Sequence, residues 1–199
     1  MPEQSYHHED LKKELIQKGL VVFSKEGYEG LSLRKVAKAC NVSQTAPYRH
    51  FKDKDELVAA ITVHAIRLFD LSLQQAAKKY TSPKEQLLEM GVAYVHFFVA
   101  NPKYLKLLFF SNIRDYIGRG FYDGRGRPEE GNPFSTFFEA VKKYRESMPE
   151  EKRSVEELAL CCWGLVHGMS VLISSGQAPF SEPLRLADSI IRSGAFLRQ

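Results

Sequence analysis

The stretch LSLRKVAKACNVSQTAPYRHF, residues 31–51, carries the clearest structural pattern in this chain. Its first half carries apolar residues at the i, i+3, i+4 and i+7 spacing of one helix face: Leu33, Val36, Ala37 and Cys40. Ser32 precedes them as a helix cap, and Asn41 follows as a residue that tolerates the left-handed conformation of a tight turn. Ser43 can cap a second short helix that ends near Phe51. The stretch therefore predicts a helix-turn-helix.

Helix signals continue on both sides of this stretch. Residues 11–23 repeat apolar side chains at helical spacing, and Gly27 is the expected stop. Cap patterns predict five further helix starts: Asp53 with Glu56, Ser82 with Pro83 and Glu85, Asn101–Pro102, Asn132–Pro133, and Ser154 with Glu157. A last helix is expected from about Ser181 to Leu197, and no strand pattern is found. The sequence thus predicts an all-α protein of about nine helices, with domains at residues 1–55 and 56–199.

The charges are distributed unevenly. The net charge of the 199 residues is only +4, which does not describe a polybasic tail. Residues 30–54, however, hold six basic side chains against the single acid Asp53: Arg34, Lys35, Lys38, Arg49, Lys52 and Lys54. Such a local excess is typical of a surface that faces phosphates, although charge alone also allows an ordinary solvated face.

Several classes of protein are disfavoured. The three cysteines, Cys40, Cys161 and Cys162, form no CxxC pair, which argues against a disulfide framework and a zinc site and fits the cytoplasm. No catalytic or nucleotide-binding motif is found, so no enzyme, metal or cofactor is predicted. The run Leu158–Ser174 falls short of a membrane span and favours a buried helix. A thiol sensor at Cys161 and Cys162 stays an alternative.

Two segments resemble a known family. The segment FSKEGYEGLSLRKVAKACNVSQTAPYRHFKDKDEL, residues 23–57, resembles the DNA-binding domain of the TetR family of transcriptional regulators. Its matching features are Phe23, Gly27–Tyr28, Ser32, Val36–Ala37, Val42–Ser43, Tyr48–Phe51, Lys54 and Leu57. The segment Trp163–Gly168 is similar to the tryptophan-histidine-glycine signature of one class of carboxy-terminal domain in the same family. Together the matches cover about a third of the chain.

The resemblance implies a role for each matching residue. Ser32, Tyr48, His50 and Lys54 occupy positions that touch DNA phosphates, and Arg34, Gln44 and Thr45 occupy base-reading positions. Core packing is the alternative for Tyr48, and a surface histidine that makes no DNA contact is the alternative for His50. Pro47 stands where leucine is frequent, and it disfavours the helical conformation of the preceding residue. The recognition helix is therefore expected to begin later than Ser43 or to have an irregular first turn.

The rest of the chain is expected to bind an effector and to dimerise. Aromatic side chains crowd residues 90–110 and 134–144, which predicts a helical core; the resemblance implies a ligand cavity within it. The polar groups expected to contact a ligand are Tyr94, His96, Trp163 and His167. The helix at residues 155–175 is apolar nearly all round, so one side is expected to meet a partner subunit. The expected interface residues are Cys162, Leu165, Met169, Leu172 and Ile190.

The expected function follows from these parts. A homodimer reads a near-palindromic operator in double-stranded DNA with two heads at a fixed spacing. A small, largely apolar effector weakens DNA binding when it favours another separation of the heads. Repression is the usual mode of the family that the chain resembles. The glycines and arginines of residues 114–132 predict a mobile loop, and its arginines are either a second anion contact or simply solvated.

Overall fold

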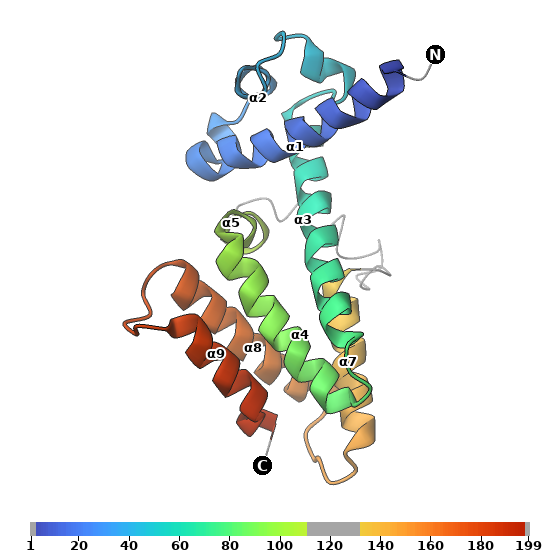
Figure 1. Ribbon diagram of the computed structural model, residues 1–199, viewed down its shortest axis with the longest axis vertical. Helices are drawn as coiled ribbons and strands as arrows, with labels where there is room; N and C mark the ends of the chain where they lie inside the picture. Colours follow the sequence, from blue (N-terminus) through green and yellow to red (C-terminus); the bar gives the residue numbers. More distant parts are fainter. Residues whose placement is uncertain (1–2, 111–131, 198–199) are drawn as a thin grey trace. The chain divides into compact units, whose positions relative to one another are not determined.

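The computed structural model describes residues 3–110 and 132–197, with side chains from residue 10 onward (Figure 1). Those ranges hold eight α-helices, two 3-10 turns and no strand, which confirms the all-α fold. The elements are α1 (Glu3–Gly30), α2 (Leu33–Ala39), η1 (Ala46–Arg49), α3 (Lys54–Ala77), α4 (Pro83–Ala100), α5 (Pro102–Phe110), α7 (Pro133–Ser147), α8 (Val155–Ser174), α9 (Pro183–Ser193) and η2 (Ala195–Leu197). Nearly all of the predicted loop at residues 114–132 lies outside the described residues.

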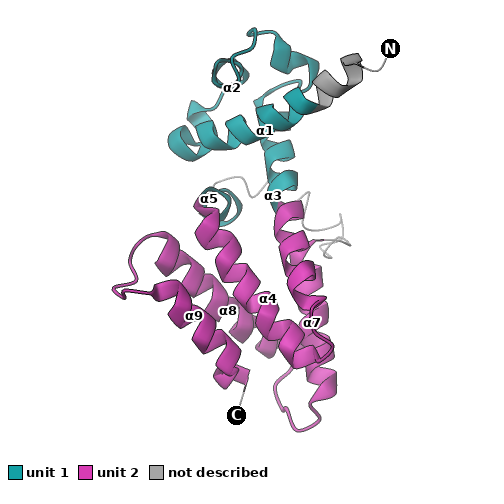
Figure 2. Ribbon diagram, in the orientation of Figure 1, with its two compact units in different colours: residues 1–65, 103–120 teal, residues 66–102, 121–199 magenta. Residues whose placement is uncertain are grey.

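The chain divides into two compact units (Figure 2). The first comprises residues 1–65 and 103–120, and the second comprises residues 66–102 and 121–199. Helix α3 contributes to both units, and the division falls after Ala65. The DNA-binding candidates all belong to the first unit, and the effector and dimer candidates all belong to the second.

In the first unit α2 packs against α1 and η1, and α1 closely approaches α3 at Gly19. A methyl group added to Gly19 would lie 2.9 Å from Cδ1 of Ile61, so the absence of a side chain there allows the contact. Gly27 interrupts α1 with a left-handed φ of 71°, in agreement with the expected stop, and the helix then resumes as far as Gly30. We call this first unit the head. Its core is formed by fully buried residues from several elements: Leu15, Val36, Ala37, Leu57 and Val58.

In the second unit, α4 lies between α7, α8 and α9 and contacts all three. Its Gly91 has the same role as Gly19, because an added methyl group would lie 3.1 Å from Ile191 of α9 and 3.4 Å from Val166 of α8. Fully buried side chains from these four helices form the core: Val95, Phe98, Val141, Leu158 and Ile191. Among the described residues, the buried positions of α8 lie along one side of the helix.

The predicted helix starts are largely correct. Ser154 and Glu157 form the expected capping box, and Asn132 accepts a hydrogen bond from the amide of Ser135 at 2.9 Å. Asp53 accepts from the amide of Glu56 at 2.9 Å, whereas the Glu56 carboxylate accepts from Lys52 rather than from Asp53. The side chain of Ser82 makes no cap hydrogen bond, so that part of the prediction is wrong.

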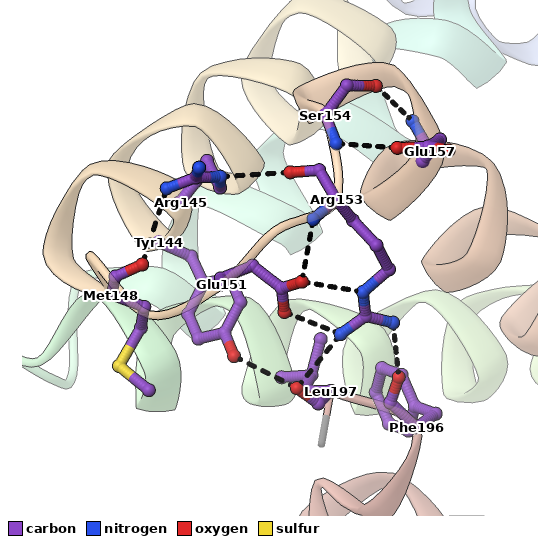
Figure 3. A network of polar contacts seen from close by, with 9 residues as sticks. All are labelled: Tyr144, Arg145, Met148, Glu151, Arg153, Ser154, Glu157, Phe196 and Leu197. Carbon is purple, nitrogen blue, oxygen red and sulfur yellow. Dashed lines mark hydrogen bonds and ion pairs between the residues drawn. The ribbon is translucent and has the colours of Figure 1, made fainter. Parts of the chain in front are cut away.

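A polar network fastens the carboxy-terminal turn to the α7–α8 connection (Figure 3). Arg153 donates to both carboxylate oxygens of Glu151, at 2.8 and 2.6 Å, and to the carbonyls of Phe196 and Leu197, at 3.1 and 3.0 Å. The hydroxyl of Tyr144 also donates to Leu197, at 3.3 Å. We call this group of five residues the C-terminal clamp. Its hydrogen bonds from Arg153 lower the pKa of Glu151 to about 2.

Candidate nucleic-acid interface and ligand site

Helix α2 presents its charged side to solvent because its apolar side is buried in the first unit. Leu33, Val36 and Ala37 are buried against the head, which leaves Arg34, Lys35 and Lys38 exposed. Ser32 caps the helix by accepting from the amide of Lys35 at 3.2 Å. Asn41 adopts a φ of 55°, the left-handed conformation that the tight turn requires.

The recognition element begins later than Ser43, as Pro47 predicts, but the α-helix expected to end near Phe51 is wrong in its length and type. Residues Ala46–Arg49 form a 3-10 turn, with i-to-i+3 hydrogen bonds such as Tyr48 to Thr45 at 3.2 Å. Pro47 explains the difference, since it has no amide hydrogen for an α-helical bond to the carbonyl of Ser43. Its ring is buried, so the proline also anchors the turn to the head. Gln44 and Thr45 consequently lie in the turn before η1 rather than on a helix.

The candidate DNA contacts lie on α2 and η1, in the residues that flank them, and at the start of α3. Three are largely exposed: Arg34, Gln44 and Thr45. Tyr48 is 52% exposed, which contradicts the alternative that it packs in the core. Ser32 and His50 are half-buried. The Lys54 ammonium lies 4.0 Å from the ring centroid of Tyr28, at the first position of α3.

A hollow of about 410 Å³ separates α2 from the turn that follows it. We call it the basic hollow; it is lined by Arg34, Lys35, Lys38, Asn41, Val42 and Gln44. Within it, the ammonium of Lys35 is already occupied by Glu26 at 2.5 Å and by the carbonyl of Gly30 at 2.8 Å. The hollow therefore brings together two base-reading candidates, Arg34 and Gln44, and the basic side chain of Lys38.

Three of the four candidate ligand contacts meet in the second unit. The hydroxyl of Tyr94 lies 2.9 Å from Nδ1 of His167, and the indole nitrogen of Trp163 donates to the same hydroxyl at 3.2 Å. Because the indole can only donate, the tyrosine proton is available for Nδ1. Burial lowers the pKa of His167 and raises that of Tyr94, so both groups are held neutral.

Aromatic rings surround this triad. Phe69 and Phe98 each lie 5.0 Å from the Tyr94 ring, and Phe134 lies 5.5 Å from Trp163. His96 is not part of the group: its Nε2 lies 2.9 Å from Asp188 of α9, on the solvent side. The structure thus brings Tyr94, Trp163 and His167 together and leaves His96 apart.

The expected dimer surface needs one correction. Cys162 is 4% exposed and lies in the core of its own chain, where burial raises its pKa to about 12. The interface role predicted for Cys162 is therefore wrong, and its thiol is poorly suited to redox sensing. Leu172 and Ile190 are about half exposed, and Leu165 and Met169 are half-buried.

The residues expected at the dimer surface did not include the most exposed large apolar side chain of α8. Leu160 is 71% exposed and starts an i, i+4, i+8, i+12 row on α8 with Gly164, Gly168 and Leu172. Methyl groups added to the two glycines would meet nothing within 4 Å. The spacing itself was the signal that could have identified this face. By length and composition α8 could also cross a membrane, with a mean hydropathy of 1.5, but core helices of globular proteins share this property.

Comparison with known proteins agrees with this geometry. The family model described as bacterial regulatory proteins, tetR family, matches residues 15–61. The model described as tetracyclin repressor-like, C-terminal domain, matches residues 87–193, which is more than half of the chain.

Relatives of known sequence carry the same description. The uncharacterized HTH-type transcriptional regulator YerO of Bacillus subtilis is 24% identical over 177 residues, 83% of this chain and 57% of that protein. An HTH-type transcriptional regulator of Haemophilus influenzae is 30% identical over 110 residues, 54% of each chain. The chain therefore spans about half the length of these curated relatives.

Solved structures show the same fold. The transcriptional regulator FadR of Bacillus subtilis, solved in complex with stearoyl-CoA, has a TM-score of 0.71 at 16% identity, over 90% of this chain and 95% of that one. A regulatory protein of the tetR family from Rhodococcus RHA1 has a TM-score of 0.67 at 17% identity, over 92% and 93%. Taken with the two family models, these findings show that the chain belongs to the tetR family of helix-turn-helix, DNA-binding transcriptional regulators, which are not enzymes.

Proposed function

We propose that this chain is a homodimeric repressor that leaves a near-palindromic operator when a small, largely apolar effector binds. The observation that carries the proposal is that Arg34, Gln44, Thr45 and Tyr48 are exposed around α2 and η1, while the apolar side of α2 is buried. Side chains of these types read base edges and phosphates in the major groove. We propose a functional division into residues 1–55 for DNA binding and residues 56–199 for effector and partner binding. A regulator of this kind is expected to act in the cytoplasm.

Within this proposal the DNA contacts have distinct roles. Arg34 can pair with both acceptors of guanine, Gln44 can pair with adenine, and the methyl group of Thr45 can meet that of thymine. Ser32, Tyr48, His50 and Lys54 fix the position of the head by contacting phosphates, as the family resemblance implies. Lys54 is suited to this because the positive end of the α3 dipole adds to its own charge.

The effector is proposed to bind beside the Tyr94–His167–Trp163 triad, in a carboxy-terminal domain of the tryptophan-histidine-glycine type. The surrounding phenylalanine rings favour an apolar ligand, while the neutral triad provides hydrogen-bonding groups that can orient it. FadR, a similar fold, was solved with an acyl-CoA, which makes long-chain acyl thioesters the first probes to use. Release from DNA requires that the ligand bind one dimer conformation more tightly than the other.

Dimerisation is proposed to occur through α8 and α9. Leu165, Met169 and Leu172 from α8 and Ile190 from α9 supply apolar surface, and the small Gly164 and Gly168 let the helices of two subunits approach closely. One head reads too few bases for specificity, so a two-fold pair is part of the same mechanism. Half-site centres are then expected about 34 Å apart, or a multiple of that distance.

Selection from random duplex DNA with the purified chain tests this function. The expected product is a near-palindrome, and stearoyl-CoA or a shorter acyl-CoA is expected to weaken binding to it. Binding without sequence preference at modest salt would remove the proposal. A selected site that is not palindromic would contradict the dimeric mode alone.

A further inference from the structure

We infer that the basic hollow receives a hydrogen-bond-accepting, negatively polarised group of the DNA, and that Lys38 is a DNA contact in addition to the seven already assigned. The inference rests on the proposed DNA-binding function and extends it. It concerns a residue that the family resemblance does not mark as a contact. The group that enters the hollow is either a backbone phosphate or the O6/N7 edge of a guanine, which share this chemistry.

The first argument is the shape of the surface. The hollow has a volume of about 410 Å³, which is ample for a phosphate or for the edge of a base. Its walls come from two segments, α2 on one side and the turn at residues 41–44 on the other. Because Arg34 and Gln44 stand on these opposite walls, any DNA group that both approach must lie over the hollow, within reach of Lys38.

The second argument is the charge of the lining. Lys35 is neutralised by Glu26, but neither Arg34 nor Lys38 has a carboxylate within 4.0 Å in the part of the chain that the structure describes. Arg34 and Lys38 are also four residues apart on one helix, where like charges destabilise each other. The first turn of α2 has no acidic residue to offset them. Two uncompensated cations on one wall of a hollow make it a place for an anion.

The third argument is the rigidity of the site. Asn41 is held in its left-handed conformation, with its amide bonded to the carbonyl of Lys38 at 3.1 Å, and the amide of Val42 bonds to Ala37 at 3.0 Å. The wall opposite Lys38 is therefore fixed by the backbone before DNA arrives. A preformed site loses less conformational entropy on binding than a flexible one.

The test compares Lys38→Ala with the control Lys143→Ala, which removes one exposed lysine from α7 in the second unit. Affinity for the selected operator and for a scrambled duplex is measured from about 0.05 to 0.5 M salt. Each lost phosphate contact lowers the slope of log K against log salt by about 0.9, hence by about 1.8 for a dimer. If the wild-type and variant complexes have equal affinity at ~1 M salt, this difference in slope makes the variant complex roughly 60-fold weaker at ~0.1 M salt.

The two sources of the bound group give different results. For a phosphate, Lys38→Ala weakens all duplexes alike, and ethylating one phosphate weakens the wild-type complex but not that of the variant. For a guanine edge, Lys38→Ala weakens binding only to duplexes that carry guanine at one base pair. Methylation of N7 of that guanine, rather than ethylation of a phosphate, then weakens the wild-type complex but not that of the variant. In both cases Lys38→Arg retains most of the affinity, because it keeps the charge.

One result overturns the inference. If Lys38→Ala and Lys143→Ala match each other in affinity, salt slope and base preference, Lys38 does not contact DNA. This outcome differs from a failure of the proposed function, in which the wild-type chain itself shows no selective binding to any duplex. Alanine is a strong helix former, so α2 is expected to persist, and an unchanged thermal midpoint would verify this.

Discussion

Replacing Glu151 by glutamine tests the C-terminal clamp, because the carboxylate is the only described acid that Arg153 contacts. The side chain of Glu151 is 4% exposed, and it receives two hydrogen bonds from the Arg153 guanidinium and a third, at 3.0 Å, from the Arg153 amide. Glutamine keeps the shape of the side chain but removes its charge. Arg153 is then left with a partly buried positive charge whose remaining described partners are the carbonyls of Phe196 and Leu197.

The size of the effect follows from the pKa of Glu151. The fall from 4.5 to about 2 corresponds to about 3 kcal/mol of interaction with the ionised carboxylate. A carboxyl whose pKa is lowered in the folded state stabilises that state above its unfolded pKa, and this stabilisation is lost as pH falls. The contribution of Glu151 is therefore complete near neutral pH, decreases below about pH 4.5 and vanishes near pH 2. We expect Glu151→Gln to lose about 2–3 kcal/mol at pH 7.

Urea denaturation at pH 7, 4.5 and 3, at one fixed protein concentration, measures this difference. The concentration is fixed because dimerisation contributes to apparent stability. The difference in free energy of unfolding between the wild type and Glu151→Gln should become steadily smaller as pH falls. Arg153→Met supplies the reciprocal variant, and the double variant should be less unstable than the two single losses predict together. A gap that is equally large at pH 3 and pH 7 would refute the assignment of the effect to the ionised carboxylate.

Three further predictions concern the proposed contacts. Gln44→Ala should relax the preference at one base position of the operator by roughly 1–3 kcal/mol, measured by binding to single-base variants; an unchanged preference removes Gln44 from the base readers. Leu160→Glu should give monomers by light scattering, whereas Val63→Glu, at another exposed apolar residue, on α3, should not; a dimeric Leu160→Glu variant would exclude this face as the interface. Trp163 is the only tryptophan of the chain, so the fluorescence of the protein should change when an effector binds. Tyr94→Phe removes the hydroxyl that accepts a hydrogen bond from the Trp163 indole, and it should give a fluorescence change of a different size. An effector that dissociates the DNA complex without any change in Trp163 fluorescence would have its site elsewhere.

The local features of the fold could be predicted from the sequence because each depends on a few neighbouring residues. Ser154 and Glu157 complete a capping box within four residues, and Asn41 adopts the left-handed turn that its short amide side chain tolerates. Pro47 similarly signalled an irregular start of the recognition element. Its full consequence, a 3-10 turn in place of a helix, could not be deduced because the burial of the proline ring depends on the rest of the head.

Features that depend on contacts between distant helices were predicted less well. The i, i+4 stripe through Cys162 fits an interface as well as it fits a core, and only the packing of α4 against α8 decides that Cys162 is buried while Leu160 is exposed. The position of His96, apart from the other candidate ligand contacts, could not be predicted for the same reason, since its partner Asp188 lies 92 residues away in the sequence. The meeting of Tyr94 with His167, 73 residues apart, could be expected as a pair of candidate ligand contacts but not as a hydrogen bond.

The short 3-10 turn changes where specificity is encoded in this head. A long recognition helix presents base-reading residues from several of its turns, whereas η1 has four residues and one of them, Pro47, is buried. The exposed groups that can reach bases are therefore divided between α2 and the turn at Gln44 and Thr45. The angle between these two segments is set by the left-handed Asn41. A substitution such as Asn41→Val, which disfavours that conformation, should therefore disturb base reading and leave the proposed phosphate contact of Lys54 in place. Sequence preference and overall electrostatic affinity are thus expected to separate at this one residue.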